Sequence, residues 1–237
     1  MLTIQLIMNT PADFLKPNAL VIGSNGTIGR ALFEQLAQTH RVSTLSRQQT
    51  DYTELSLQEH FRELSALGDF DRIVCCVGVL HDTSVSPEKN LQQVSAAALQ
   101  HYFQINSIIP MLCLKVFHPL LSRQNASVFT CLSAMVGSIG DNRLGGWYGY
   151  RSSKAALNML VKTTAIEITR TNKNARIIAV HPGTTVSELS APFAANVAQD
   201  NYYTPQQSAT RIIKIMDRLR AEDSGKFFNW NGDTLPW

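Results

Sequence analysis

Short apolar runs alternate with longer amphipathic stretches along most of the chain. The short runs predict strands at 19–22, 41–45, 72–77, 126–132, 176–180 and 226–230, with a further short strand just before Asp51. The longer stretches repeat apolar residues at helical spacing and predict helices at 27–38, 55–67, 95–121, 148–171 and 205–221. Strands that alternate with helices in this way are typical of a parallel sheet. The pattern therefore predicts a single α/β domain with a doubly wound, Rossmann-type parallel sheet.

The alternating pattern also sets the domain boundaries. We expect a loose N-terminal extension at 1–17 and one Rossmann-type domain at 18–237, because no internal repeat or linker interrupts the pattern. Within that domain, the region 184–203 is rich in small and polar residues and is marked by proline. Such a composition is typical of a loop that covers a binding site, so we expect a substrate lid there.

Composition and charge argue against several other classes of protein. The net charge is +3, and the 21 lysines and arginines are scattered, so we expect neither a nucleic-acid surface nor a membrane surface. The four cysteines and six histidines show no metal-ligand spacing, so no bound metal is implied. The cysteines fall in apolar runs, which suits buried thiols in a reducing compartment. We expect a cytoplasmic protein.

A glycine-rich turn follows the first predicted strand and opens the first predicted helix. Glycines at such a position allow the backbone to approach a pyrophosphate, whose charge the helix N-terminus favours. In this strand–turn–helix setting, the motif predicts dinucleotide binding, and the alternative is a tight turn without a ligand. The candidate contacts are Gly23, Ser24, Asn25, Thr27, Ile28 and Gly29.

The end of the second predicted strand favours NADP over NAD. An acidic residue here would pair with the ribose 2′-hydroxyl, whereas Ser46 followed by Arg47 suits a 2′-phosphate. The alternative for Arg47 is an ordinary surface charge. Asp51 could contact the adenine edge or cap the next helix. Gly78 ends the strand at 72–77, where its backbone could lie close to the cofactor.

Tyr150 and Lys154 are spaced for proton chemistry. Residues four apart lie on one helical face, about one turn from each other. An ammonium beside a phenol favours the phenolate and thus lowers a pKa that is ordinarily about 10. A tyrosine tuned in this way can give a proton to a carbonyl or take one from an alcohol. The same spacing also occurs in many helices by chance, so the pair gains its meaning from the motifs upstream.

Polar residues in apolar surroundings complete the candidate site. Asn106 lies in an apolar helical stretch with Pro110 four residues later, where it could bind freed carbonyls, hold a water or only complete the helix. Ser133 and Ser138 follow the strand at 126–132. In open α/β sheets, ligands bind at the carboxyl ends of the strands, so these serines are candidates to face the site.

Taken in order, these motifs resemble the short-chain dehydrogenase/reductase family over nearly the whole chain from Ala19 to Trp237. The segments 137–148 and 153–158 and the closing Leu235-Pro236-Trp237 are similar to its C-factor and sniffer-like carbonyl reductase branch. The ordered family motifs are the Gly23–Gly29 loop, Gly78, Asn106, Tyr150-x-x-x-Lys154 and Pro182-Gly183.

The resemblance implies a reaction and roles for its residues. A nicotinamide would exchange hydride with a small carbonyl or alcohol substrate while Tyr150 moves the proton. Lys154 would lower the pKa of Tyr150 and hold the nicotinamide ribose, and Asn106 would keep a water in the proton relay. Pro182 and Gly183 would also contact the cofactor. The family further implies a homodimer or homotetramer that pairs through the long helices at 95–121 and 148–171.

Three departures from the family pattern bear on activity. Ala134 replaces the second serine of a common Ser-Ser pair, so Ser138 is the preferred donor to the substrate oxygen and Ser133 the second choice. The stretch 75–78 reads Cys-Cys-Val-Gly in place of Asn-Asn-Ala-Gly, and Thr27 departs from the usual glycine loop. The loss of one hydrogen-bond donor to the substrate oxygen, as at Ala134, can reduce the rate by about 10²–10³. The main alternative to an enzyme is therefore a cofactor-binding signalling or regulatory protein with little turnover.

Overall fold

The computed structural model describes residues 16–187 and 202–237 and contains a six-stranded parallel sheet. The strand order is β2-β1-β3-β4-β5-β8, and every neighbouring pair is parallel. The strands are β1 (Asn18–Ile22), β2 (Arg41–Leu45), β3 (Phe70–Cys75), β4 (Ser127–Leu132), β5 (Ala175–Val180) and β8 (Phe227–Phe228). The predicted doubly wound parallel sheet is confirmed.

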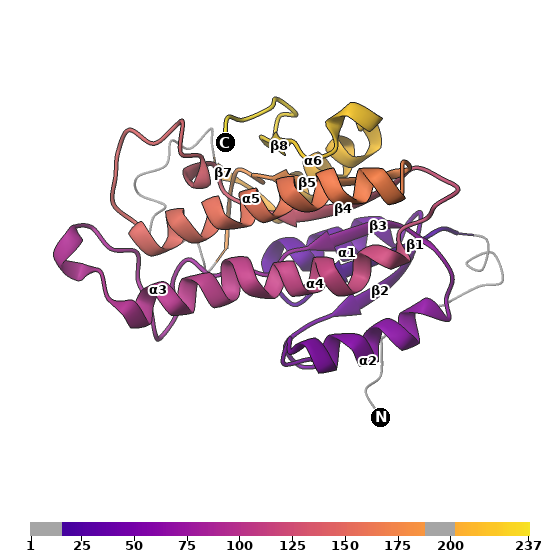
Figure 1. Cartoon of the computed structure of the whole chain (residues 1–237), viewed down its shortest axis with the longest axis horizontal. Helices are drawn as coiled ribbons and strands as arrows, with labels where there is room; N and C mark the ends of the chain where they lie inside the picture. Colours follow the sequence, from indigo (N-terminus) through magenta and orange to yellow (C-terminus); the bar gives the residue numbers. More distant parts are fainter. Residues whose placement is uncertain (1–15, 188–201) are drawn as a thin grey trace.

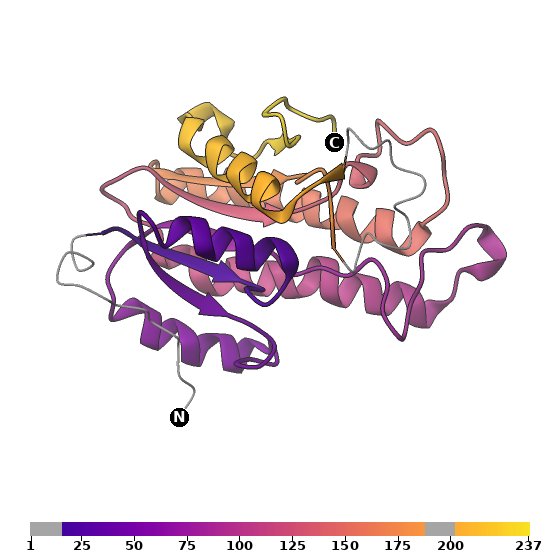
Figure 2. The same ribbon diagram turned by 180° about the vertical axis from the view of Figure 1, so that it is seen from behind.

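Helices cover both faces of this sheet. Figure 1 shows α2 (Glu54–Ser65), α4 (Ile109–Phe117) and α5 (Tyr148–Thr171) on one face. Figure 2 shows α1 (Thr27–Leu36) and α6 (Pro205–Arg218) on the other. Because side chains alternate along a strand, Leu20 and Ile22 of β1 join the α2–α4–α5 core, whereas Ala19 and Val21 join the α1–α6 core. Burial on both faces explains why β1 is apolar from Ala19 to Ile22.

The long helix expected at 95–121 is divided into separate helices. It consists of α3 (Ala96–Phe103), a π-helical turn at Gln104–Ile108 and α4, followed by a 3-10 turn at His118–Leu120. Pro110 has no N–H to donate to the carbonyl of Asn106, which helps to widen the helix at this point. The wide turn places Asn106 and Ser107 in the interior, a position where such turns often serve function.

The short strand expected before Asp51 is wrong. This part of the described chain is a turn, in which Tyr52 has a φ of 61°. Asp51 accepts hydrogen bonds from the backbone N–H (2.9 Å) and the hydroxyl (2.8 Å) of Thr53. Thr53 in turn caps α2 by accepting from the N–H of Ser56. Asp51 therefore supports the helix cap indirectly, and its bonds to Thr53 lower the pKa of its carboxyl group.

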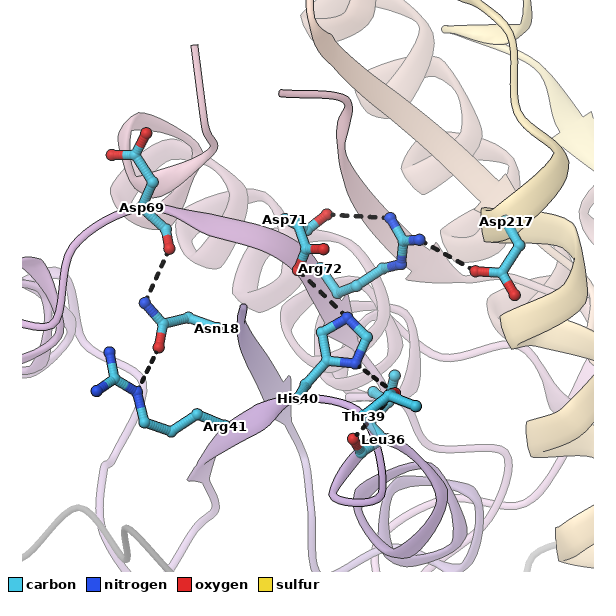
Figure 3. Close-up of polar contacts among 9 residues, drawn as sticks. All are labelled: Asn18, Leu36, Thr39, His40, Arg41, Asp69, Asp71, Arg72 and Asp217. Carbon is cyan, nitrogen blue, oxygen red and sulfur yellow. Dashed lines mark hydrogen bonds and ion pairs between the residues drawn. The ribbon is translucent and has the colours of Figure 1, made fainter. Parts of the chain in front are cut away.

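Polar side chains at the amino ends of the strands bind one another (Figure 3). Asn18 donates to the carbonyl oxygens of Leu67 (3.0 Å) and Asp69 (2.9 Å) and accepts from Nε of Arg41 at 2.7 Å. Nearby, Nη2 of Arg72 lies 3.0 Å from a carboxylate oxygen of Asp217, which joins β3 to α6. Side chains at the amino ends of the strands thus bind partners within the chain.

Candidate active site

The glycine loop after β1 is built so closely that a side chain at Gly29 would not fit. A Cβ at Gly29 would lie 2.3 Å from the carbonyl oxygen of Gly23. Gly23 has a φ of 80°, and its N–H bonds the carbonyl oxygen of Leu45 at 2.7 Å, tying the loop to the end of β2. These contacts bring the start of α1 directly over the carboxyl ends of β1 and β2.

The start of α1 has the properties of an anion site. Gly26 precedes the helix without a side-chain cap, and the first turn contains no acidic residue. Asn25 and Thr27 are exposed beside it, and Ser24 is buried in the loop. The first amide groups of α1 are therefore available to a phosphate. The backbone cradle suits the pyrophosphate of a dinucleotide, which would be held by the Gly23–Gly29 loop.

The two residues after β2 differ in their contacts: the Ser46 hydroxyl is hydrogen-bonded within the chain, whereas the Arg47 guanidinium is exposed. Ser46 is buried and donates its hydroxyl hydrogen to Oε1 of Gln49 at 2.9 Å. Arg47 is exposed, and no ion pair to it is found within residues 16–187 and 202–237. A free guanidinium at this position suits a phosphate on the adenosine ribose. Asp51, which is engaged with Thr53, is less suited to contact the adenine.

Lys154 is a buried cation that reaches from α5 to the end of the sheet. Its side chain is 4% exposed, and its Nζ donates to the carbonyl oxygen of Leu132 at 3.0 Å. Burial lowers the pKa of Lys154 to about 8. A Cβ at Gly78 would lie 3.1 Å from Nζ of Lys154 and 3.3 Å from Oδ1 of Asn106. The glycine after β3 therefore makes room for both side chains.

Asn106 connects this lysine region to the helix that carries Tyr150. Its Oδ1 accepts from the N–H of Val79 at 2.8 Å, and its Nδ2 donates to the carbonyl oxygen of Val79 and to Oγ of Ser153. The Ser153 hydroxyl lies 2.9 Å from the carbonyl oxygen of Tyr150. The fully buried asparagine thus fixes the loop after β3 against the first turns of α5.

Tyr150 is half-buried and lies among aromatic rings. Its ring centroid is 6.3 Å from that of Tyr102 and 6.2 Å from that of Trp147, both at steep angles. Burial raises the pKa of Tyr150 above its ordinary value, and Lys154 contributes no opposing effect in the chain alone. In the cofactor-free chain, Nζ of Lys154 bonds the carbonyl oxygen of Leu132. The lowering of the Tyr150 pKa by Lys154 stays a prediction for the protein with its cofactor bound.

A buried carboxylate, Glu88, holds the start of α5 and was not foreseen from the sequence. Its side chain is 3% exposed and accepts from the N–H of Gly149 at 3.1 Å. Its backbone carbonyl oxygen also accepts from the N–H of Trp147, which precedes α5 and provides no side-chain cap to that helix. A carboxylate at a helix N-terminus is electrostatically favourable. Glu88 therefore positions the turn that contains Tyr150.

The glycine before Tyr150 was the available clue to this arrangement. A Cβ at Gly149 would lie 2.3 Å from Cδ2 of Tyr102 and 2.9 Å from Oε1 of Glu88. A glycine in the first turn of an otherwise good helix signals that something approaches it closely. The sequence does not indicate what approaches, because Glu88 is 61 residues away and stands in a polar loop.

The two candidate serines differ in what their hydroxyl groups already bind. Ser133 is buried and donates to Oδ1 of Asn158 at 2.7 Å, so its hydroxyl hydrogen is engaged. Ser138 accepts from the N–H of Asp141 at 3.1 Å. No acceptor for the Ser138 hydroxyl hydrogen is found in the described part of the chain. Ser138 is thus the serine that retains a donor for a substrate oxygen.

The turn after β5 packs against aromatic side chains from the C-terminal part of the domain. Gly183 has a φ of 80°, and a Cβ there would lie 2.8 Å from Cδ2 of Tyr203 and 3.2 Å from Cδ1 of Trp230. Pro182 precedes it at the carboxyl end of the sheet. The neighbouring His181 is held neutral, because burial lowers its pKa to about 4.

The region expected to form the lid is described at its two ends. Thr184–Thr185 (β6) pairs in parallel with Tyr202–Tyr203 (β7), so the two ends lie side by side. Residues 188–201 of the expected lid, and residues 1–15 of the expected extension, lie outside the described residues. Among the residues that are described, no cluster of three His, Cys, Asp or Glu side chains could hold a metal ion. None of the helices in the same residues is long and apolar enough to cross a membrane.

The fold and the ordered motifs define a class of oxidoreductase. The chain belongs to the short-chain dehydrogenase/reductase family, and residues 21–219 match the family model described as enoyl-(acyl carrier protein) reductase. The expected short-chain dehydrogenase/reductase family is thereby confirmed.

Two curated relatives and two solved structures illustrate the similarity. The chain is 33% identical over 139 residues to 1-hydroxy-2-glutathionyl-2-methyl-3-butene dehydrogenase of Rhodococcus sp. (strain AD45), covering 59% of this chain and 58% of that enzyme. It is 29% identical over 147 residues to C-signal of Myxococcus xanthus, covering 62% and 83% of the two chains. The match thus spans less than two thirds of the Rhodococcus enzyme's length.

The solved structures agree over a larger share of the chain and show the fold. Carbonyl reductase Sniffer of D. melanogaster is 19% identical with a TM-score of 0.76, covering 94% of this chain and 100% of that one. The NADPH-bound carbonyl reductase from chicken fatty liver is 20% identical with a TM-score of 0.76, covering 94% of each chain.

Proposed function

We propose that the protein is an NADP(H)-dependent oxidoreductase that transfers hydride between the nicotinamide and a small carbonyl or alcohol substrate, with Tyr150 as acid and base. The observation that carries this proposal is that Asn106 is linked to the Tyr150 backbone through Ser153 and borders the same space at Gly78 as Lys154 does. Asn106 bonds Ser153, whose hydroxyl bonds the carbonyl oxygen of Tyr150. Gly78 leaves space beside Nζ of Lys154 and Oδ1 of Asn106.

Several features support NADP rather than NAD as the cofactor. Arg47 is exposed at the end of β2, where a phosphate on the adenosine ribose would lie. The start of α1 offers uncapped amide groups to the pyrophosphate. Some structural neighbours, including the chicken carbonyl reductase, are described with NADPH or NADP bound. Gly78, Pro182 and Gly183 provide backbone at the carboxyl ends of the strands for the nicotinamide half.

The chain's own residues would divide the remaining work. Bound NADP(H) supplies the hydride, and the protein supplies position and a proton. Tyr150 would give its phenolic proton to the substrate oxygen in reduction, or take one in oxidation. Lys154 would make phenolate formation easier once its Nζ leaves Leu132 for the ribose and the phenol. Ser138 would donate a hydrogen bond to the substrate oxygen, and Asn106 would hold the water that returns the proton.

A cofactor-binding signalling or regulatory protein with little turnover is the second candidate. Ala134 favours it, because the family's usual serine is missing there, and so does the similarity to C-signal. The buried Asn106 and Lys154 beside a half-buried Tyr150 favour the enzyme. Turnover of a carbonyl panel separates the two, because both would bind the cofactor.

We also propose a homodimer or homotetramer located in the cytoplasm. Met159 and Ile166 are one heptad apart on α5 and are 65% and 50% exposed, and Ile108 beside α4 is 45% exposed. A second copy covering these side chains would bury them. All four cysteines are free, which suits a reducing compartment. A monomeric mass in sedimentation velocity would contradict the oligomer.

The proposed cofactor is tested by fluorescence titration of NADPH and NADH on wild type, Arg47→Ala and a control, Arg62→Ala, in which an exposed arginine of α2 is removed. We expect tight NADPH binding that weakens at least about tenfold in Arg47→Ala, with NADH little changed, since one phosphate contact is worth roughly 1.5–3 kcal/mol. Arg62→Ala should match wild type. If neither nucleotide binds wild type at micromolar concentration, the proposal is wrong.

The proposed chemistry is tested with Tyr150→Phe on a panel of carbonyl substrates. Removal of a general acid reduces the rate by about 10²–10⁴, so activity should nearly vanish while NADPH affinity stays within a few-fold. If wild type binds NADPH but turns over none of the carbonyl substrates in the panel, the result would instead support the regulatory protein.

A further inference from the structure

A basic hollow lies beside α6 on the face of the sheet opposite Tyr150 and Lys154. It has a volume of ≈ 600 Å³ and is lined by the outer turns of α6 and by the segment that follows β8. Figure 2 shows α6 on the α1 side of the sheet, whereas α5 covers the other side. A cavity of this size can hold a small molecule, and it is separate from the candidate active site.

The hollow carries more positive than negative side chains. Five cationic residues and two acidic residues line it. Asp223 is engaged by Lys226 at 2.6 Å and also lies 4.0 Å from Arg220. The second acid, Asp233, accepts from Nδ2 of Asn231 at 2.6 Å. The positive charges of the remaining three cations, Arg211, Lys214 and Arg218, are therefore not balanced by these two acids.

These three cations form one stripe on α6. Arg211, Lys214 and Arg218 are spaced by three and four residues, which places them on the same helical face. No acidic partner of any of the three is found within the described ranges 16–187 and 202–237. Like charges at this spacing destabilise a helix, so a bound anion would relieve a repulsion that the chain does not relieve itself.

Arg211 is held in a fixed orientation by two aromatic rings. Its guanidinium carbon lies 3.7 Å from the ring centroid of Tyr203 and 4.2 Å from that of Trp230. Its Nη1 is buried, with no hydrogen-bond partner among the described residues. The two ring centroids lie 5.0 Å apart, and the rings cover one side of the guanidinium, which favours its charge by cation–π attraction. An unpaired buried donor is unfavourable, so this atom is suited to an incoming acceptor.

We propose that this hollow is a binding site for a small, multiply charged anion that carries phosphate groups. Arg211 would bind a phosphate through its fork of N–H groups, as arginine commonly does. Lys214 and Arg218 would neutralise further charge along the stripe. A single carboxylate would compensate only one of the three charges, which favours a phosphate ester or a polyphosphate. This proposal does not depend on the proposed oxidoreductase activity.

The site is tested by calorimetric titration of the full chain with inorganic tripolyphosphate, with Trp230 fluorescence as a second readout. We expect saturable binding of one anion. The double variant Lys214→Gln/Arg218→Gln should weaken it at least tenfold without loss of folding, because both side chains are exposed. Arg211→Gln should weaken it to a similar extent. The control Arg62→Gln/Lys173→Gln removes the same charge from exposed positions elsewhere and should bind as wild type does.

Three outcomes would overturn the proposal. Wild type could show no saturable binding. The control could weaken binding as much as the double variant, which would show general charge attraction. Binding could disappear in Arg47→Ala, which would place the anion at the cofactor loop. A parallel titration with citrate distinguishes phosphate from carboxylate chemistry, and equal binding of citrate would refute the assignment to phosphate.

Discussion

The two edges of the central sheet treat their polar groups in opposite ways. At the amino ends of the strands, Asn18 makes three hydrogen bonds within the chain, and Arg72 pairs with Asp217. At the carboxyl ends, the start of α1 has no side-chain cap and Lys154 is buried against a carbonyl oxygen without a carboxylate. Asn18 and Arg72 thus bind partners within the chain, whereas the start of α1 and Lys154 leave groups that a ligand would satisfy.

This difference shows where stability and function are separated in the fold. A buried cation without an anionic partner and a helix start without a cap both reduce stability. The sheet tolerates both features at its carboxyl edge because apolar cores pack on its two faces and side chains at its amino edge form hydrogen bonds. Substitutions at the amino edge should therefore change stability alone, and substitutions at the carboxyl edge should change ligand binding.

The largest effect is expected from Gly29→Ala at the carboxyl edge. The new Cβ would meet the Gly23 carbonyl oxygen, so the loop must move and its amides lose the pyrophosphate. Since hydrogen bonds to a charged group are worth roughly 1.5–3 kcal/mol each, NADPH affinity should fall about 10²-fold or more, measured by fluorescence titration.

Gly68→Ala at the amino edge is the matched control. Gly68 has a φ of 92°, and nothing lies within 4 Å of its added Cβ, so only backbone strain of about 1–2 kcal/mol is expected. NADPH affinity should not change. Equal losses of affinity in the two variants would mean that the edges do not differ as described.

Lys154→Met should reveal the destabilising effect of the buried cation. The pKa of Lys154 is about 8 in the fold, against about 10.4 in the unfolded chain. Below the folded value, the lysine is charged in both states and destabilises the fold. Between the two values, the folded protein loses the proton first, so wild type gains stability relative to the variant as pH rises. At about 1.36 kcal/mol per unit, the gain is about 3 kcal/mol.

This gain is measured by urea unfolding of both proteins from about pH 7 to about pH 10. Comparison with the variant removes the contributions of other groups that titrate in this range. A constant difference between the two proteins over the range would show that the lysine is not desolvated in the free protein.

Asn18→Ala at the amino edge is expected to reduce stability without changing cofactor binding. The substitution leaves Nε of Arg41 and the carbonyl oxygen of Asp69 without their Asn18 partner, while Nη2 of Arg41 still bonds Leu67, so the cost is about 1–3 kcal/mol of unfolding free energy. Chemical denaturation measures this loss, and NADPH affinity at temperatures where the variant is folded should equal that of wild type. Weakened cofactor binding in this variant would contradict the expectation that substitutions at the amino edge change stability alone.

Features set by neighbouring residues could be predicted from the sequence. The parallel sheet followed from alternating strands and helices, and the Gly23–Gly29 turn followed from its place between a strand and a helix. The buried position of Asn106 was indicated by its apolar surroundings. The short strand before Asp51 was wrong because the N–H groups of Gln49 and Thr50 both bond the carbonyl oxygen of Ser46 and form a turn there.

Features set by distant contacts could not be predicted in this way. Glu88 meets Gly149 only because the fold brings the loop after β3 to the start of α5. The cation–π contacts of Arg211 with Tyr203 and Trp230 join α6 to the segment after β8. The direction of Nζ of Lys154 depends on the carbonyl oxygen of Leu132, and residue spacing does not reveal it.

The short parallel pair of β6 and β7 has a consequence for how such a protein can diversify. The pairing of Thr184–Thr185 with Tyr202–Tyr203 brings the two ends of the intervening stretch side by side and closes it as a loop. Doubling the length of a closed loop costs only about 0.6 kcal/mol. We therefore expect insertions, deletions and exchanged sequences between these two strands to be tolerated without loss of folding and with Tyr150 and Lys154 kept in place.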